Sequence, residues 1–182
     1  MAAGGHDTGV TGETGDGAII VWDIASGERV HELLGHESLV LETYFSPDGS
    51  QLLTSAVDAT ARLWDMATGG ELFVLEGHTG PIWRADFSPD GSIVATGASD
   101  GRLMLWDVAT GTALMTLAQY EGSVGGIDFS PDGTSLMVAT DRVLEYVLPL
   151  DTLVELAQSR VTRTLTDEEC RQYLHMESCP GQ

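Results

Sequence analysis

The chain has 182 residues, of which 42% are apolar and 20% charged, with a mean hydropathy near zero. These values fit one globular domain with a buried core, and they exclude a multi-enzyme architecture and a disordered chain. Asp and Glu number 28 against 8 basic residues, all Arg, so the net charge is −20. Such a surface repels phosphate, which argues against nucleic acid and anionic membranes as partners and favours a basic protein.

The cellular setting is only broadly indicated. No basic segment followed by an apolar stretch opens the sequence, and no segment approaches the roughly 18 apolar residues that a membrane span needs. We therefore expect neither a secretory signal nor a membrane anchor, and a cytoplasmic location. Lys and Asn are both absent, which fits either a GC-rich genome or selection for an acidic surface.

An internal repeat of 42 residues dominates the sequence. Trp22, Trp64 and Trp106 are each followed by Asp and stand 42 residues apart, and Ser-Pro-Asp-Gly recurs with the same step. Residues 35–76 laid on 77–118 without a gap give 19 identities in 42 positions. This self-similarity predicts a repeat architecture.

Within one period the pattern predicts four short strands. In the second unit they are expected at 39–45, 51–56, 61–64 and 71–76, separated by turns rich in Pro, Gly and Asp. Short β-rich segments divided by such turns indicate an antiparallel meander with no long helix.

A Gly-His pair, then an Asp, then Trp-Asp, at about 42 residues per unit, resembles the WD40 repeat of β-propellers. The resemblance covers about residues 10–147 and implies an all-β fold, a partial propeller of about three and a half four-stranded antiparallel blades. The blades are expected at about 10–34, 35–76, 77–118 and 119–147.

The resemblance also implies a buried hydrogen-bond chain of His, Ser or Thr, Asp and Trp within each blade. By spacing, the two complete sets are His36, Thr54, Asp58 and Trp64, and then His78, Thr96, Asp100 and Trp106. A buried Asp or His is costly unless paired, so these residues are expected to be structural and not catalytic.

The last unit departs from this pattern. Tyr120 stands where His belongs, Met137 is placed at the Thr position, Tyr146 stands at the Trp position, and Asp141 remains. The hydrogen-bond chain cannot form there in the same way, and apolar packing is expected to replace it.

An open ring of this size needs closure, because closure protects sheet edges. Two explanations remain open: the chain is the C-terminal part of a longer propeller, or it closes by self-association.

A helical tail is expected at 148–182. Apolar residues at helical spacing predict one helix over about 150–161, and a capping box predicts another over about 167–175. The tail resembles those that end WD-repeat regions in bacterial multidomain proteins, especially actinobacterial ones. Cys170, His175 and Cys179 lie within it, but their spacing fits no usual zinc site.

No cofactor, metal or catalytic residue is predicted. Residues 97–101 match the G-x-S-x-G hydrolase pattern, but that motif requires a strand-to-helix turn, whereas a turn between antiparallel strands is expected here. Phosphate-loop, zinc-protease and EF-hand patterns are not found in the sequence.

A binding surface is instead expected on the innermost strands. Position 40/82/124 is apolar in every unit, whereas the next two positions vary and carry Trp83, Arg84 and Glu42. Trp and Arg are enriched at interaction hot spots, so these three residues are the predicted partner-binding residues, although Trp83 could instead serve only in packing.

The sequence thus predicts a non-catalytic protein-interaction or scaffold module, the C-terminal portion of a larger bacterial signalling or regulatory protein. Two alternatives stay open. The chain could be the regulatory domain of a multidomain enzyme, such as a kinase or peptidase, or a propeller that binds a small ligand or glycan.

Overall fold

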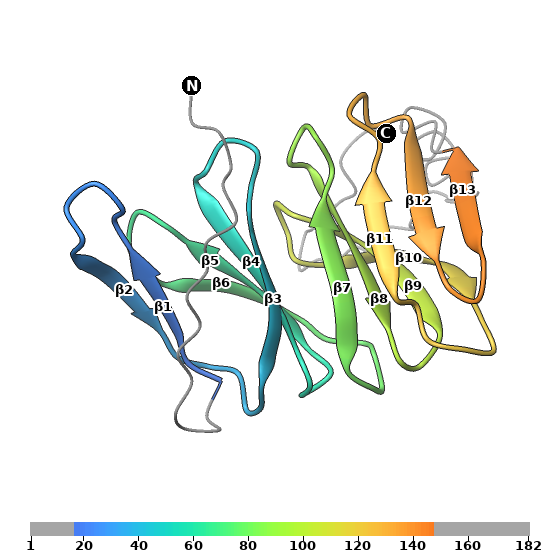
Figure 1. Cartoon of the computed structure of the whole chain (residues 1–182), viewed down its shortest axis with the longest axis horizontal. Helices are drawn as coiled ribbons and strands as arrows, with labels where there is room; N and C mark the ends of the chain where they lie inside the picture. Colours follow the sequence, from blue (N-terminus) through green and yellow to red (C-terminus); the bar gives the residue numbers. More distant parts are fainter. Residues whose placement is uncertain (1–16, 148–182) are drawn as a thin grey trace, which may run out of the picture. The chain divides into compact units, whose positions relative to one another are not determined.

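The computed structural model describes residues 17–147, which form β-strands joined by turns and loops, with no helix among them (Figure 1). The strands are β1 (Ile19–Trp22), β2 (Arg29–Leu33), β3 (Val40–Phe45), β4 (Gln51–Ala56), β5 (Ala61–Asp65), β6 (Glu71–Leu75), β7 (Ile82–Phe87), β8 (Ile93–Ala98), β9 (Arg102–Asp107), β10 (Ala113–Gln119), β11 (Gly126–Phe129), β12 (Ser135–Ala139) and β13 (Val143–Val147). The predicted all-β fold is confirmed for this part of the chain.

The strands make four antiparallel sheets, each built from consecutive strands. The two central sheets, β3–β6 and β7–β10, have the four strands predicted for a blade. The first sheet contains β1 and β2, and the last contains β11, β12 and β13. The further strand expected in the first blade precedes residue 17 and lies outside the described residues.

The turn that follows β3, β7 and β11 explains why Ser-Pro-Asp-Gly recurs. The Ser46 hydroxyl donates to Asp48 Oδ1 at 2.7 Å, and the Gly49 amide donates to the Ser46 carbonyl at 2.8 Å. Gly49 has a φ of 74°, a left-handed conformation that glycine adopts without steric cost. The same bonds recur in the turns that begin at Ser88 and Ser130.

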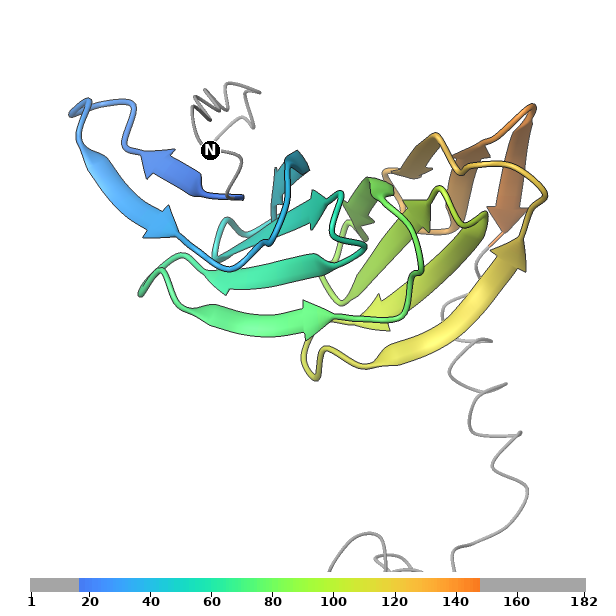
Figure 2. The ribbon, with the colours of Figure 1, turned by 90° about the horizontal axis from the view of Figure 1, so that it is seen from below.

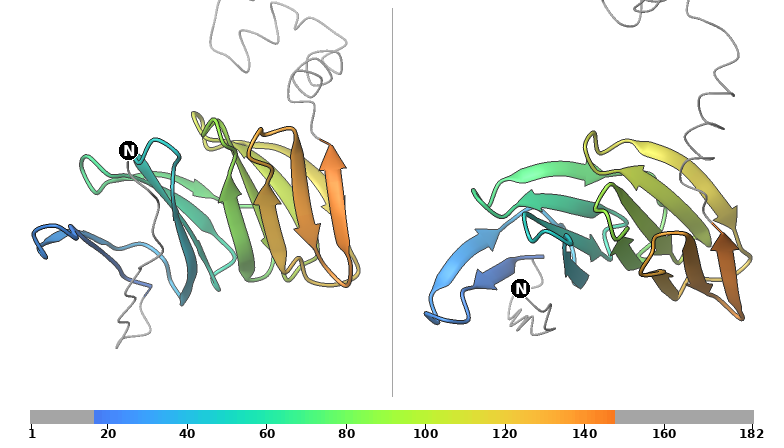
Figure 3. Two further views of the ribbon diagram at one scale, coloured as in Figure 1. Left: turned by 45° about the horizontal axis from the view of Figure 1, so that its top comes forward. Right: turned by 90° about the horizontal axis from the view of Figure 1, so that it is seen from above.

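The four sheets follow one another around an arc (Figures 2 and 3). The first strands of the last three sheets, β3, β7 and β11, lie on its concave side, and the last strands, β2, β6 and β10, lie on its convex side. Val30, Leu72 and Leu114 occupy equivalent positions on these outer strands, and all three are exposed.

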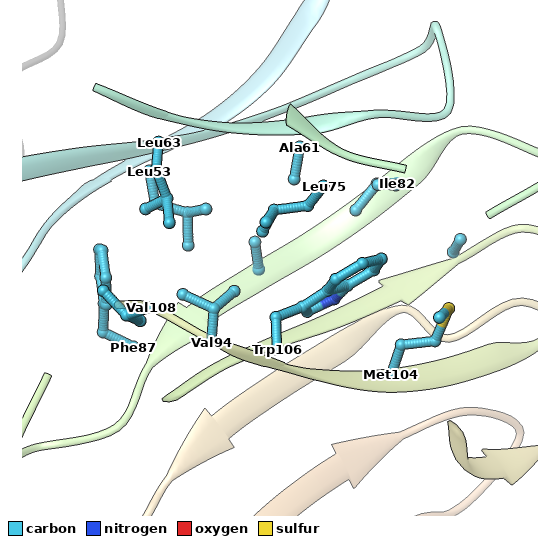
Figure 4. Close-up of a cluster of buried hydrophobic side chains, with 12 residues drawn as sticks. Leu53, Ala61, Leu63, Leu75, Ile82, Phe87, Val94, Met104, Trp106 and Val108 are labelled. Carbon is cyan, nitrogen blue, oxygen red and sulfur yellow. The ribbon is translucent and has the colours of Figure 1, made fainter. Parts of the chain in front are cut away.

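The hydrophobic core lies between neighbouring sheets and not within a single one. Leu53, Leu63 and Leu75 of the second sheet pack against Val94 and Trp106 of the third (Figure 4). A similar cluster joins the first sheet to the second. Each sheet is therefore held mainly by burial of apolar area against its neighbours.

Both predicted hydrogen-bond chains are confirmed. In the third sheet the Trp106 indole N–H donates to Thr96 Oγ1 at 2.8 Å, and Thr96 Oγ1 lies 2.8 Å from His78 Nε2. His78 Nδ1 lies 3.1 Å from Asp100 Oδ1. The second sheet repeats this arrangement with Trp64, Thr54, His36 and Asp58.

Burial and hydrogen bonding set the protonation states of the His and Asp side chains in these hydrogen-bond chains. Burial lowers the pKa of His78, although the hydrogen bond to Asp100 opposes the shift. Burial alone would raise the pKa of Asp100, but hydrogen bonds from the backbone of Thr79 and Arg102 and from His78 outweigh it and lower the pKa to about 2. A neutral His78 beside an ionised Asp100 lets the Thr96 hydroxyl donate to Nε2 while Nδ1–H donates to the carboxylate.

In the last sheet a different contact takes the place of this hydrogen-bond chain. The hydroxyls of Tyr120 and Tyr146 are 2.5 Å apart, so the two side chains at the His and Trp positions bond directly. The residue in the Thr register is Val138, because it pairs with Ile127 as Thr96 pairs with Ala85. The assignment of Met137 to that position was therefore wrong by one residue.

The remaining expectations concern residues that are not described. The two predicted helices and Cys170, His175 and Cys179 lie outside residues 17–147. Within that range no helix is long and apolar enough to cross a membrane.

The shared Thr hydroxyl gives a direct test of this fold. Replacing Thr96 by Val keeps the shape but leaves the buried Trp106 N–H and His78 Nε2 without their partner. Because each unsatisfied buried group costs about 1–3 kcal/mol, Thr96→Val should lower the free energy of unfolding by about 2–4 kcal/mol, measured by urea denaturation followed by circular dichroism. Thr116→Val, on the exposed side of β10, should change it by less than about 0.5 kcal/mol. Equal effects of the two substitutions would contradict this role of the hydroxyl.

Candidate functional site

The inner strands β3, β7 and β11 lie side by side and bring the predicted binding residues together (Figure 1). Arg84 Nη1 of β7 pairs with Glu42 Oε1 of β3, so two of the three residues form an ion pair that links the second sheet to the third. Burial raises the pKa of Glu42, and the Arg84 guanidinium opposes that shift. Gly126 stands at the equivalent position of β11, so the last sheet has no side chain there.

Trp83 lies at an irregularity of β7. The register against β8 shifts between Ile82 and Arg84, so Trp83 is the extra residue of a β-bulge, and its exposed fraction is 39%. Bulges re-aim side chains, which explains how an inner-strand tryptophan remains accessible. The Trp83 carbonyl also accepts a hydrogen bond from Arg84 Nη1 at 2.9 Å, which ties the bulge to the ion pair.

Three polar residues that the sequence did not single out belong to the same surface. Tyr44, Asp86 and Asp128 follow the predicted positions by two residues on β3, β7 and β11, which places them on the same faces of these strands. Burial raises the pKa of Tyr44 to about 12, and the nearby Glu42 adds to the shift. We call Glu42, Tyr44, Arg84, Asp86 and Asp128 the inner-strand cluster.

Asp86 links the third sheet to the fourth. Its Oδ2 accepts a hydrogen bond from the backbone N–H of Phe129 at 3.0 Å. Burial raises the pKa of Asp86 to about 6; the Phe129 bond opposes this shift, and the negative charges of Asp128 and Glu42 add to it. One carboxyl group with a raised pKa therefore bridges two sheets.

The inner-strand cluster and Trp83 combine several kinds of side chain at one surface. Carboxylates, a guanidinium and an exposed indole offer hydrogen bonds, charge and apolar area to a partner. Within residues 17–147 no group of three or more His, Cys, Asp or Glu side chains could hold a metal ion. The Gly97–Gly101 motif contains the turn between β8 and β9, and its Asp100 is engaged by His78.

The titration of Asp86 predicts a pH-dependent stability. Its folded pKa of about 6 exceeds the ordinary value of 3.8, so the folded chain binds this proton more tightly than the unfolded chain does. The carboxyl therefore destabilises the fold above pH 6, and that cost fades as the pH falls from about 6 to about 4. Asp86→Asn, whose carbonyl oxygen can still accept from Phe129, should raise the free energy of unfolding at pH 7.5 by about 1–2 kcal/mol, after allowance for solvent screening.

The same measurement near pH 4 should give no such gain for Asp86→Asn. Glu145→Gln is the matched control, because Glu145 is an exposed carboxylate on β13 and lies outside the inner-strand cluster. A gain that did not depend on pH, or a loss of stability at pH 7.5, would contradict the assignment of Asp86.

Comparison with known proteins identifies the repeat. The family model described as "WD domain, G-beta repeat" matches residues 27–65 and 69–107. A relative, the nuclear distribution protein PAC1 of the fungus Arthroderma otae, is 44% identical over 48 residues. That match covers 26% of this chain and spans 10% of the relative's length.

The matched segments explain how repeats and sheets are related. Residues 27–65 contain β2 of the first sheet and β3, β4 and β5 of the second, and residues 69–107 contain the equivalent strands one sheet further on. Each repeat ends at the Trp-Asp pair whose Trp donates to the buried Thr hydroxyl. Residues 27–65 and 69–107 thus match the WD40 repeat both in sequence and in the arrangement of their strands.

Proposed function

We propose that this chain is a non-catalytic protein-interaction or scaffold module of the WD40 type that recognises its partner through the inner strands. The observation that carries the proposal is the exposed Trp83 beside the Glu42–Arg84 ion pair, held by strands from two sheets. A rigid β framework that displays an aromatic side chain next to charges has the composition of an interaction hot spot. The inter-sheet links through Arg84 and Asp86 support the proposal because they preorganise the surface.

The partner that we propose is basic. The chain carries a net charge of −20, and the inner-strand cluster contributes three carboxyl groups against one guanidinium. Complementary charge accelerates encounter and suppresses acidic competitors, and its contribution is screened by salt. Neither nucleic acid nor a membrane surface matches this charge.

The wider setting stays a prediction. We propose a C-terminal position in a larger bacterial signalling or regulatory protein in the cytoplasm, although the relative that was matched is fungal. The alternatives are a regulatory domain of a multidomain kinase or peptidase, and a propeller that binds a small ligand or glycan. Trp83 is the one feature of the inner strands that favours the last of these.

Substitution of Trp83 tests the proposal. A peptide that binds the chain, selected from a display library, should lose at least tenfold in affinity with Trp83→Ala, because truncation of a hot-spot aromatic costs about 2 kcal/mol. Fluorescence anisotropy of the labelled peptide measures this loss. Leu114→Ala, which truncates an exposed apolar residue on outer strand β10, is the matched control and should leave the affinity unchanged.

The selected peptide should also be rich in Arg or Lys, and its affinity should fall as the salt concentration rises. Equal losses for Trp83→Ala and Leu114→Ala would reject the inner strands as the binding surface. Binding that does not respond to salt would reject the basic partner while leaving the interaction function intact.

Self-association is the alternative to a longer propeller. A propeller protects its sheet edges by closing into a ring, and two copies of a partial ring can close one another. Light scattering of the purified chain should therefore give a discrete mass of twice 19.3 kDa, with circular dichroism confirming that the sample is folded. A folded monomer would contradict self-association.

A further inference from the structure

A cavity of about 590 Å³ lies between the end of β10 and the last sheet, and no residue of the inner-strand cluster lines it. It opens between the loop that joins β10 to β11 and the turn that joins β12 to β13, and its lining includes Tyr120, Glu121, Asp141 and Leu144. In the second and third sheets, the equivalent loop and turn are joined by the His–Asp hydrogen bond.

The cavity coincides with the place where the repeat pattern fails. In the third sheet His78 reaches Asp100 across this space, and the backbone N–H of Thr79 also donates to Asp100 at 2.8 Å. In the last sheet Tyr120 bonds to Tyr146 instead, and Asp141 is 77% exposed and accepts a hydrogen bond from the neighbouring Thr140. The loop and the turn are thus no longer drawn together by the side chain at the His position.

A shorter hairpin contributes to the opening. Thr96 and Trp106 are ten residues apart in the third sheet, whereas their structural equivalents Val138 and Tyr146 are eight residues apart. The turn between β12 and β13 has therefore lost two residues. Less chain is available to fill the space that the turn covers in the complete blades.

The lining offers mainly hydrogen-bond acceptors beside apolar area. Glu121 and Asp141 supply carboxylates, and Gln119 uses its amide N–H₂ to donate to the Asp100 carbonyl at 2.9 Å, which leaves its amide oxygen as an acceptor. Tyr120 and Leu144 supply an aromatic ring and an aliphatic side chain. The cation of the lining, Arg142, is 72% exposed and lies 3.6 Å from Asp141.

We propose that this cavity binds a cationic side chain, Arg or Lys, of a protein partner. A guanidinium or ammonium group pairs with Glu121 and competes with Arg142 for Asp141, and it can lie against the tyrosine ring, while its aliphatic stem covers the apolar part of the lining. The net charge of −20 attracts such a group, and the carboxylates disfavour an anion. The proposal rests on the proposed function only in that the cation belongs to a protein, and it uses a surface separate from Trp83.

A nuclear magnetic resonance titration of the whole ¹⁵N-labelled chain tests this site. The probe is the capped tripeptide acetyl-Gly-Arg-Gly-amide, and the reference is the same peptide with citrulline, which keeps the shape of arginine but is neutral. The arginine peptide should produce saturable shifts of the amides of Glu121, Gly122 and residues 140–142, and the citrulline peptide should not. Equal shifts with both peptides, or shifts spread evenly over the acidic surface, would overturn the proposal.

Two pairs of variants make the test specific. Glu121→Gln should weaken binding of the arginine peptide about three- to fivefold, the loss expected for one exposed charge pair. Glu37→Gln is the matched control, because Glu37 holds the equivalent position in the second sheet, where His36 and Asp58 tie the loop to the turn. Tyr120→Phe keeps the ring and should preserve binding, whereas Tyr120→Leu should lose it. Thermal unfolding identifies any variant that fails to fold.

These results separate the two proposals. Trp83→Ala should leave the arginine-dependent shifts at the cavity unchanged. If a partner binds through Trp83 and the amides at the cavity show no chemical-shift change with the arginine peptide, the cavity site alone is overturned. Arginine-dependent shifts at the cavity with no partner bound at Trp83 would overturn the inner-strand surface alone. A Glu37→Gln variant as weak as Glu121→Gln would reduce the cavity to a diffuse effect of surface charge.

Discussion

The buried threonine hydroxyl is the contact on which the rest of each complete blade depends. In the second and third sheets it accepts a hydrogen bond from an indole N–H and donates one to an imidazole nitrogen. One oxygen atom therefore joins the loop before the inner strand to the second and third strands of the sheet. The imidazole can accept only while it is neutral, which its burial ensures. The position of the loop before each inner strand, and through it the position of the inner strand, follows from this bond. Exposed Trp83 lies on an inner strand whose own blade is closed in this way.

Much of the blade could be predicted from sequence because its determinants are local. The 42-residue step placed the tryptophans, threonines and turns. His78, Thr96 and Asp100 were paired correctly because the resemblance to WD40 repeats implied the hydrogen-bond chain and the spacing located its members. The last sheet was harder, since a hairpin shortened by two residues breaks the step. That shortening comes after Val138, so the step and the strand pairing agree that Val138, and not Met137, takes the threonine position.

The links between sheets could not be predicted in the same way. The sequence indicated Glu42 and Arg84 as a variable pair, but their ion pair requires β3 and β7 to lie side by side. The bond from Phe129 to Asp86 involves a backbone N–H, which leaves no trace in residue type. The exposure of Trp83 depends on a bulge, which no residue type announces. The ion pair and the Phe129 bond are properties of neighbouring units, whereas the repeat reports on a single unit.

The offset between repeat and sheet carries a consequence for how such a chain can change over evolutionary time. Because residues 27–65 begin in one sheet and end in the next, every boundary between repeats falls inside a sheet whose strands are bonded to one another. Duplication of one 42-residue stretch of the gene would insert a complete blade and recreate the same junction on both sides. Blade number can therefore rise or fall by copying errors without the invention of a new interface, and individual copies are then free to diverge, as the one ending in Tyr146 has done.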